Sequence, residues 1–209
     1  MFTGIVEETG VVRNIKKGAK SAVLTIEGNR IFDDLKLGDS VATNGVCLTI
    51  TSIKNHFFTA DVMNETLSKS SLGSLTAGNG VNLERAVLAN GRFGSHIVSG
   101  HIDGIGKVTS IKKDDIAVWY TVKTPPKIML YIVEKGSIAI DGISLTVAGI
   151  LHDSFLVSVI PHTAKETTLS EKKIGSIVNL ENDIVGKYIK KFAQDSKGIT
   201  EDFLNRNGF

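Results

Sequence analysis

The stretch "NGVCLTI" at residues 44–50 returns in altered form as "DGISLTV" at residues 141–147. An Asn-Gly or Asp-Gly pair between strand-like runs is typical of a tight β-hairpin turn. Side chains alternate between the two faces of a strand, so Cys47 and Thr49 share one face. Ser144 and Thr146 share the equivalent face in the second stretch. The two stretches therefore predict the same strand twice, with the only cysteine of the chain replaced by serine in the second.

This similarity extends over most of the chain. Residues 45–84 align with residues 142–181 without a gap and give 13 identities in 40 positions, where ordinary composition would give about two or three. "VNLE" occurs at 81–84 and again at 178–181. The start of each copy also matches, with identities at Gly4/Gly100, Gly10/Gly106, Val12/Val108 and Ile15/Ile111. The sequence predicts a tandem duplication.

Each copy has the pattern of an all-β fold. Short runs rich in Val, Ile, Thr and Phe are separated by Gly, Asn and Asp, as in sandwiches and barrels. Roughly six strands per copy are enough to close a small barrel, which leaves no free sheet edge. Short helices are expected after residue 64 and at 125–132, where two prolines favour a helix start. We therefore predict an N-terminal barrel at 1–97, a C-terminal barrel at 98–183 and a helix with a tail at 184–209.

The C-terminal segment is predicted to be helical. Asp183 is a good N-cap, and apolar residues follow it at helical spacing until "DSKG" at 195–198 ends the pattern. These apolar residues are Ile184, Val185, Tyr188, Ile189 and Phe192. The first copy has no such helix. The apolar side of the C-terminal helix must be covered either by a barrel of the same chain or by the same helix of a neighbouring subunit.

Composition excludes several classes of protein. The chain is 42% hydrophobic and 22% charged, with a formal net charge of +2, as in ordinary globular proteins. Neither a nucleic-acid nor a membrane partner is expected from so small a charge. One cysteine cannot form an intrachain disulfide, the first ten residues do not resemble a signal peptide, and no apolar run approaches about 18 residues. These features predict a cytoplasmic protein.

The residues that could carry chemistry are few. The chain has neither a glycine-rich phosphate loop nor a GxSxG elbow, and His96 and His101 do not have a zinc-site spacing. We expect no cofactor and no metal. Cys47 with Thr49, and Ser144 with Thr146, place small polar pairs beside a glycine turn, where a flat ligand could approach. The alternative is that Cys47 is a small buried side chain and Ser144 its steric substitute.

Two histidines are candidates for proton transfer near neutral pH. His101 lies in "SGHIDG", and its counterpart in the first copy is Ile5, so the repeated fold does not require an imidazole there. His162 lies in "IPHT", opposite Glu65 of the first copy. A single histidine in a loop can also be merely solvated.

Seven motifs in order carry a resemblance to a known family. They are "MFTGIVEETG", "NGVCLT", "MNETL", "SGHIDG", "DGISLTV", "IPHT" and "VNLE". Together they resemble the alpha chain of the riboflavin synthase family over roughly residues 1–192. The resemblance implies two similar six-stranded barrels and a homotrimer assembled with help from the C-terminal helix. It also implies a cofactor-free dismutation of two 6,7-dimethyl-8-ribityllumazine molecules to riboflavin and 5-amino-6-(ribitylamino)uracil, and a possible association with lumazine synthase.

The resemblance further implies that each barrel binds one lumazine, and that the N-terminal barrel of one subunit meets the C-terminal barrel of another at the active site. The N-terminal pocket would comprise Gly4, Ile5, Val6, Cys47, Leu48, Thr49, Asp61, Val62, Met63, Asn64, Glu65 and Thr66. The C-terminal pocket would comprise Gly100, His101, Ile102, Lys135, Ser144, Leu145, Thr146, Ser158, Val159, Ile160, Pro161, His162 and Thr163.

Two identical substrates must react differently, and the Cys47/Ser144 and Ile5/His101 differences would break the equivalence of the two pockets. We expect His101 to transfer protons, and Cys47, Ser144 and Thr146 to position substrate or add to it transiently. The alternatives are a non-catalytic lumazine- or flavin-binding protein of the optical-antenna type, and a purely structural double barrel.

Overall fold

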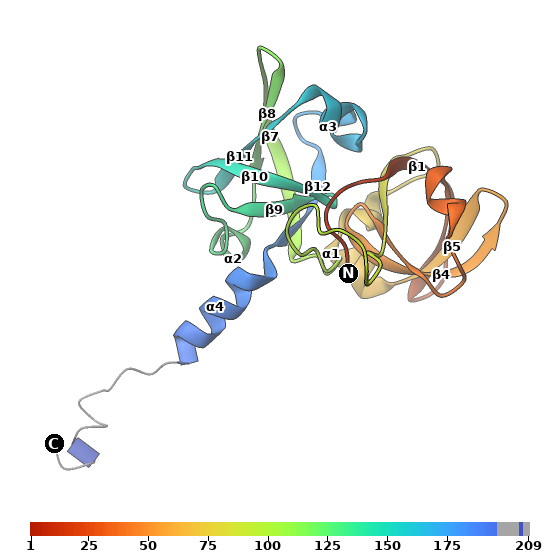
Figure 1. Cartoon of the computed structure of the whole chain (residues 1–209), viewed down its shortest axis with the longest axis horizontal. Coiled ribbons are helices and arrows are strands. Elements are labelled where there is room, and N and C mark those ends of the chain that lie inside the picture. Colours follow the sequence, from red (N-terminus) through yellow and green to blue (C-terminus); the bar gives the residue numbers. More distant parts are fainter. Residues whose placement is uncertain (196–204, 207–209) are drawn as a thin grey trace.

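The computed structural model describes residues 1–195 and 205–206. Two barrels lie side by side, and a single helix projects from the second one (Figure 1). The first barrel contains β1 (Glu8–Lys17), β2 (Ser21–Glu27), β3 (Ser40–Thr43), β4 (Val46–Lys54), β5 (Phe57–Met63) and β6 (Gly80–Arg85). The second contains β7 (Gly104–Asp114), β8 (Ala117–Lys123), β9 (Ser137–Ile140), β10 (Ile143–Ile150), β11 (Ser154–Val159) and β12 (Ile177–Asn182).

Both barrels are closed and have the same topology. The strand order is β1-β2-β5-β4-β3-β6 in the first and β7-β8-β11-β10-β9-β12 in the second, with every neighbouring pair antiparallel. The helical elements are η1 (Arg30–Asp33), α1 (Asn64–Lys69), η2 (Ser71–Ser74), α2 (Pro126–Met129), α3 (Pro161–Lys165), η3 (Thr168–Glu171) and α4 (Ile184–Asp195). The predicted duplication, the six strands per copy and the short helices near 64 and 126 are confirmed.

Each barrel has its own apolar interior. The inward side chains of β4, Val46, Leu48 and Ile50, are at most 4% exposed and pack with Phe58 in the first core. The corresponding strand β10 contributes equivalent side chains to a separate core that contains Phe155. Burial alternates from Val46 to Ile50 and from Ile143 to Val147, which explains why the sequence pattern predicted the strand faces there correctly.

The predicted hairpin turns are also present. Asn44 and Gly45 have φ values of 45° and 78°, and Asp141 and Gly142 have 46° and 81°. Positive φ at both central residues is what a type I′ turn requires. The two turns pack against each other, because a Cβ atom on Gly45 would lie 2.6 Å from the Gly142 nitrogen. Glycine is therefore needed both for backbone conformation and for contact between the barrels.

The asparagines of the two "VNLE" motifs join the barrels. The side chain of Asn82 donates to the Asp141 carbonyl at 2.9 Å and accepts from the Thr168 N–H at 2.8 Å. Asn179 makes the reciprocal bonds and donates to the Asn44 carbonyl at 2.8 Å. Both amides are at most 1% exposed. Buried polar groups that are fully paired favour one arrangement over others, so these bonds fix one barrel against the other.

A short segment before each barrel crosses the interface. Phe2 and Val98 form an antiparallel bridge, with N–H to carbonyl distances of 2.7 and 3.1 Å. Both side chains are fully buried and pack with Ala42 and Ala139, one residue from each barrel. The N-terminus is therefore a structural part of the interface between the barrels.

Replacing Phe2 with Ala should lower the free energy of unfolding by about 3–5 kcal/mol, because it empties a fully buried aromatic site. Urea denaturation measures the change. Phe93→Ala is a matched control, since Phe93 lies in the linker and is 52% exposed. Equal losses in the two variants would contradict a structural role for Phe2.

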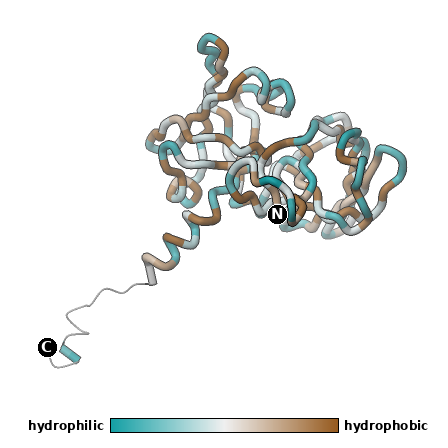
Figure 2. Tube along the Cα trace, in the orientation of Figure 1, coloured by the Kyte–Doolittle hydropathy of each residue, from teal (hydrophilic) through white to brown (hydrophobic). Residues whose placement is uncertain are grey.

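Helix α4 begins as predicted, with an Asp183 carboxylate oxygen accepting from the Val185 N–H at 3.0 Å. Lys187 pairs with Asp103 at 2.7 Å, and the Lys190 ammonium lies 4.9 Å from the centre of the Tyr131 ring. These polar side chains turn towards the second barrel. The apolar residues Val185, Tyr188, Ile189 and Phe192 are 52–66% exposed. Figure 2 shows hydrophobic stretches along the projecting helix. The chain's own barrels therefore leave this apolar side open.

Part of the predicted helix end at 195–198, and most of the tail to 209, lie outside the described residues. Within the described part of the chain, no helix is long and apolar enough to cross a membrane.

Candidate lumazine sites

The small polar residues of β4 and β10 lie on the outer faces of the barrels. Cys47 is half-buried and Thr49 exposed, whereas Val46 and Leu48 point into the core. Ser144 and Thr146 have the same two environments on β10. The predicted pairing of Cys47 with Thr49, and of Ser144 with Thr146, is therefore correct. Cys47 is not fully enclosed, which weakens its interpretation as a buried packing residue.

A glycine carbonyl meets each of these strands. The Cys47 N–H donates to the Gly100 carbonyl at 2.9 Å, and the Ser144 N–H donates to the Gly4 carbonyl at 2.9 Å. A Cβ atom on Gly100 would lie 2.6 Å from the Cys47 Cβ, and one on Gly4 would lie 2.6 Å from the Ser144 Cβ. Gly100 and Gly4 also have φ values of 81° and 73°. Only glycine allows this approach and this conformation.

These contacts change the predicted grouping of the site residues. We expected Gly4–Val6 to accompany Cys47, and Gly100–Ile102 to accompany Ser144. The backbone contacts instead join Gly4 to Ser144 and Gly100 to Cys47. Val6 packs against the second core and Ile102 against the first. The reason is the crossing at Phe2 and Val98, which carries each segment onto the opposite barrel. His101 therefore follows the glycine that contacts Cys47.

The remaining predicted residues of the first barrel lie near the ends of β4 and β5. Ile50 pairs with Ala60, so Thr49 and Asp61 flank this pair on adjacent strands. Asp61 and Met63 are exposed, and Asn64, Glu65 and Thr66 form the start of α1. The exposed Glu65 pairs with Lys69 at 2.6 Å, and this hydrogen bond lowers the pKa of the carboxyl group.

The second barrel repeats this arrangement with different residues. Val147 pairs with Val157, so Thr146 and Ser158 flank that pair. Ile160, Pro161 and His162 are exposed at the start of α3, and Thr163 is half-buried there. Lys135 is exposed, has a φ of 63°, and its N–H donates to the Val147 carbonyl at 2.8 Å.

Four predicted binding residues are core side chains. Leu48, Val62, Leu145 and Val159 are between 1% and 9% exposed and point into the barrels. They can meet a ligand on the outer face only through their backbone groups. Their side chains serve the barrel cores.

His96 is a candidate that sequence reasoning considered only as a metal ligand. Its Nδ1 lies 2.7 Å from the Ser144 Oγ, and the Ser95 hydroxyl also donates to that oxygen. Burial lowers the pKa of His96, although the negative charges of Asp183 and Glu181 act in the opposite direction. A neutral imidazole at pH 7 can accept a proton. No sequence signal marks this contact, because His96 lies in the linker and has no counterpart in the first copy.

The burial of His96 predicts a pH effect on stability. A histidine whose pKa is lower in the folded protein takes up a proton more readily when the chain unfolds. Its contribution is therefore complete above the unfolded pKa of about 6.5 and is lost as the pH falls below it. The melting temperature of His96→Gln should fall less between about pH 7.5 and 5.5 than that of the wild type. The exposed His152→Gln variant should behave as the wild type, and an unchanged slope in His96→Gln would contradict the prediction.

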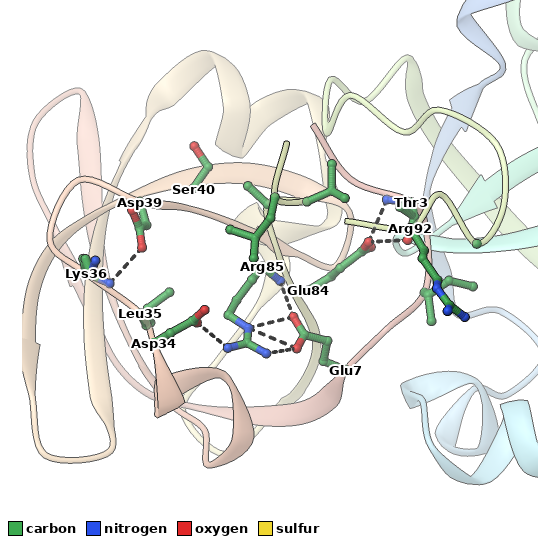
Figure 3. A pocket seen from close by; sticks show the side chains of 15 residues that line it. Thr3, Glu7, Asp34, Leu35, Lys36, Asp39, Ser40, Glu84, Arg85 and Arg92 are labelled. Carbon is green, nitrogen blue, oxygen red and sulfur yellow. Dashed lines mark hydrogen bonds and ion pairs between the residues drawn. The ribbon is translucent and has the colours of Figure 1, made fainter. Parts of the chain in front are cut away.

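A cavity of about 620 Å³ lies at the outer face of the first barrel (Figure 3). Its lining includes Ile5 from the predicted site residues, together with Thr3, Ser40, Glu84 and Arg92. Ser40 pairs with Thr49 across β3 and β4, so a hydroxyl-bearing residue that we did not predict stands beside a predicted one. Such a surface can hydrogen-bond a polar, polyhydroxylated ligand.

One wall of this cavity is held by ion pairs. The Arg85 guanidinium pairs with Glu7 at 2.5 Å and with Asp34, as the dashed lines in Figure 3 show. This wall therefore carries two carboxylates and one guanidinium. Among the described residues, no cluster of three or more His, Cys, Asp or Glu side chains is arranged to hold a metal ion.

Comparison with known proteins places both barrels in one class. The family model described as the lumazine binding domain matches residues 3–86 and again 99–183. The molecule is thus a tandem of two lumazine-binding domains. The chain is 56% identical to a riboflavin synthase of Actinobacillus pleuropneumoniae and 50% identical to one of Bacillus subtilis, with full coverage of all three chains. It belongs to the riboflavin synthase family, as its motifs predicted.

Solved structures show the same architecture. A crystal structure of LumP complexed with 6,7-dimethyl-8-(1'-D-ribityl) lumazine has a TM-score of 0.80 and 25% sequence identity, and the alignment covers 87% of this chain and 99% of that one. A LumP structure complexed with riboflavin has a TM-score of 0.82 at the same identity and coverage.

Proposed function

We propose that the chain is a riboflavin synthase. It transfers four carbons between two molecules of 6,7-dimethyl-8-ribityllumazine, which gives riboflavin and 5-amino-6-(ribitylamino)uracil. The observation that carries this proposal is the pair of outer-face sites, alike in backbone and different in reactive side chains. In one site Cys47 contacts Gly100, the residue before His101, and in the other Ser144 contacts His96. Like sites suit two identical substrates, and unlike side chains suit their different roles.

The chemistry needs few protein groups. A base removes a proton from the acidic 7-methyl group of the donor, and C7 of the acceptor undergoes nucleophilic addition. His101 serves as the proton-transfer group beside Cys47. Cys47, Ser144 and Thr146 position the rings or add to them transiently. Holding two rings in reactive orientation can contribute about 7–11 kcal/mol to catalysis.

The test is direct. Purified protein is incubated with the lumazine and no added cofactor, and riboflavin absorbance is followed. The solved LumP complexes favour one alternative, a non-catalytic protein that holds the same ligands. Bound colour without turnover would support that alternative and contradict the synthase proposal. Steady formation of riboflavin would support the synthase.

We further propose that the chain works as a homotrimer whose active site combines the first barrel of one subunit with the second barrel of another. The open apolar side of α4 supports this, because Lys187 and Lys190 hold the helix with that side away from its own barrel. The corresponding units are 1–97, 98–183 and 184–209. A cytoplasmic location and an association with lumazine synthase belong to the same proposal.

Removing the chain from Asp183 onward should reduce the sedimenting mass from about three chains to about one, because it deletes the exposed apolar side of α4. Activity should fall with it. Analytical ultracentrifugation and the turnover assay measure the two effects. Lys191→Gln serves as a control that changes the helix without changing its apolar residues. A truncated protein that remains trimeric and active would show that other surfaces hold the assembly.

A further inference from the structure

The last residue of each "VNLE" motif is a buried glutamate that holds a backbone segment. The Glu181 carboxylate accepts from the Ser99 N–H at 2.7 Å, from the Ser99 hydroxyl at 2.6 Å and from the Gly100 N–H at 3.0 Å. Glu84 accepts the same set from Thr3 and Gly4, at 2.7, 3.0 and 3.0 Å. The exposed fractions of the two glutamates are 1% and 6%.

These positions suit a side chain whose two terminal oxygens both accept hydrogen bonds. Each oxygen faces hydrogen-bond donors, and an ionised carboxylate only accepts. Burial raises the pKa of Glu84, while the bonds from Thr3 and Gly4 oppose that rise. A glutamine of the same size would turn an NH₂ group towards at least one of these donors. The backbone segment would then shift to avoid the contact.

Each held segment also contacts the opposite barrel. Glu181 belongs to the second barrel, yet the Gly100 carbonyl accepts from Cys47 of the first. Glu84 belongs to the first barrel, yet the Gly4 carbonyl accepts from Ser144 of the second. We propose that Glu84 and Glu181 are positioning residues that act across the barrels, each completing the candidate lumazine site of the other one.

This inference rests on the proposed function, and it makes a specific claim about His101. His101 directly follows Gly100, and its N–H donates to the Ser99 hydroxyl at 3.2 Å. Glu181 therefore holds the backbone at Gly100, which contacts Cys47 and leads directly into His101. Glu84 sets only the segment at Ser144. The two glutamates, alike in sequence and contacts, should differ in their coupling to His101.

A double-mutant cycle on the full chain tests this claim. Glu181→Gln should lower kcat roughly 10- to 100-fold, about 1.4–2.7 kcal/mol, but only slightly when His101 is already Gln. Glu84→Gln should lower kcat by a similar factor in both backgrounds, because well-separated groups act additively. Glu166→Gln, an exposed change on the second barrel, should leave kcat unchanged. Equal coupling of both glutamates to His101, or no loss in either variant, would overturn the proposal.

A milder change guards against misfolding. Should Glu181→Gln fail to fold, Ser99→Ala takes its place in the double-mutant cycle, because it removes one of the three hydrogen bonds to Glu181.

Turnover by the wild type reports on the proposed function separately from the coupling pattern. If the wild type binds lumazine without converting it, the cycle is run on dissociation constants with Cys47→Ala in place of His101→Gln. Glu181→Gln must then couple to Cys47 and Glu84→Gln must not. A wild type that neither binds nor converts lumazine overturns both proposals.

Discussion

Replacement of His101 with Gln is expected to lower turnover by about 10²–10⁴, the usual contribution of a general acid–base group. Glutamine keeps the approximate size and polarity of the side chain but cannot transfer a proton near pH 7. Lumazine binding should persist, because the backbone at Gly100 and its bond to Cys47 remain. Steady-state kinetics with a parallel binding titration separates the two effects.

The control for this prediction is His152→Gln, which changes an exposed histidine in the turn between β10 and β11. It should retain wild-type activity. A loss of less than about tenfold in His101→Gln would exclude the role in proton transfer. His96 would then be the stronger candidate, because it already hydrogen-bonds to Ser144 and its pKa is lowered by burial.

Local features of this fold were predictable because their causes are local. Type I′ turns require positive φ at two adjacent residues, and Asn-Gly and Asp-Gly supply it at 44–45 and 141–142. Strand faces follow from a period of two, so the environments of Cys47 and Ser144 could be inferred from their apolar neighbours. Because the chain is duplicated, each of these local patterns occurs twice in the sequence. Barrel closure followed from the number of strands.

The grouping of the site residues was not predictable in the same way. It depends on the bridge between Phe2 and Val98, which lie far apart in sequence. Periodicity places a residue on one face of its own strand. It does not show which barrel is contacted by the segment that precedes the first strand of each copy. A repeat alignment favours assigning Gly4 to the first barrel and Gly100 to the second. The glycines do keep equivalent positions, but each contacts the strand of the other copy.

His96 and Ser40 were not predicted for a similar reason, because their contacts join segments that sequence patterns do not relate to each other. His96 lies in the linker between the copies, so the repeat offers no partner with which to compare it. Ser40 stands beside Thr49 only because β3 and β4 pair in the observed register. Conversely, Leu48 and Leu145 were included as parts of continuous motifs, although alternation directs their side chains into the cores. Motif-based transfer names a stretch of backbone, whereas the alternation of a strand separates its two faces.

If catalysis joins the first barrel of one subunit to the second barrel of another, two inactive variants should restore activity together. The first variant carries Cys47→Ala with His101→Ala, which damages only the site on the first barrel. The second carries Ser144→Ala with Thr146→Val, which damages only the site on the second barrel. Each variant alone builds assemblies in which every combined site contains a defect. A mixed trimer contains contacts between two undamaged barrels, so activity should reappear after joint refolding or co-expression.

The crossed grouping of the site residues makes this experiment more selective. A third variant with His101→Ala and Ser144→Ala damages both sites, because His101 accompanies Cys47 and not Ser144. It should therefore fail to rescue a variant with Cys47→Ala and Thr49→Val, whereas the grouping expected from sequence alone predicts rescue of that variant. Mixing two folded pools that do not exchange subunits should leave every pair inactive. If confirmed mixed trimers of the second variant with the Cys47→Ala and Thr49→Val variant also stay inactive, each chain must build its site from its own two barrels, and the intersubunit site is wrong.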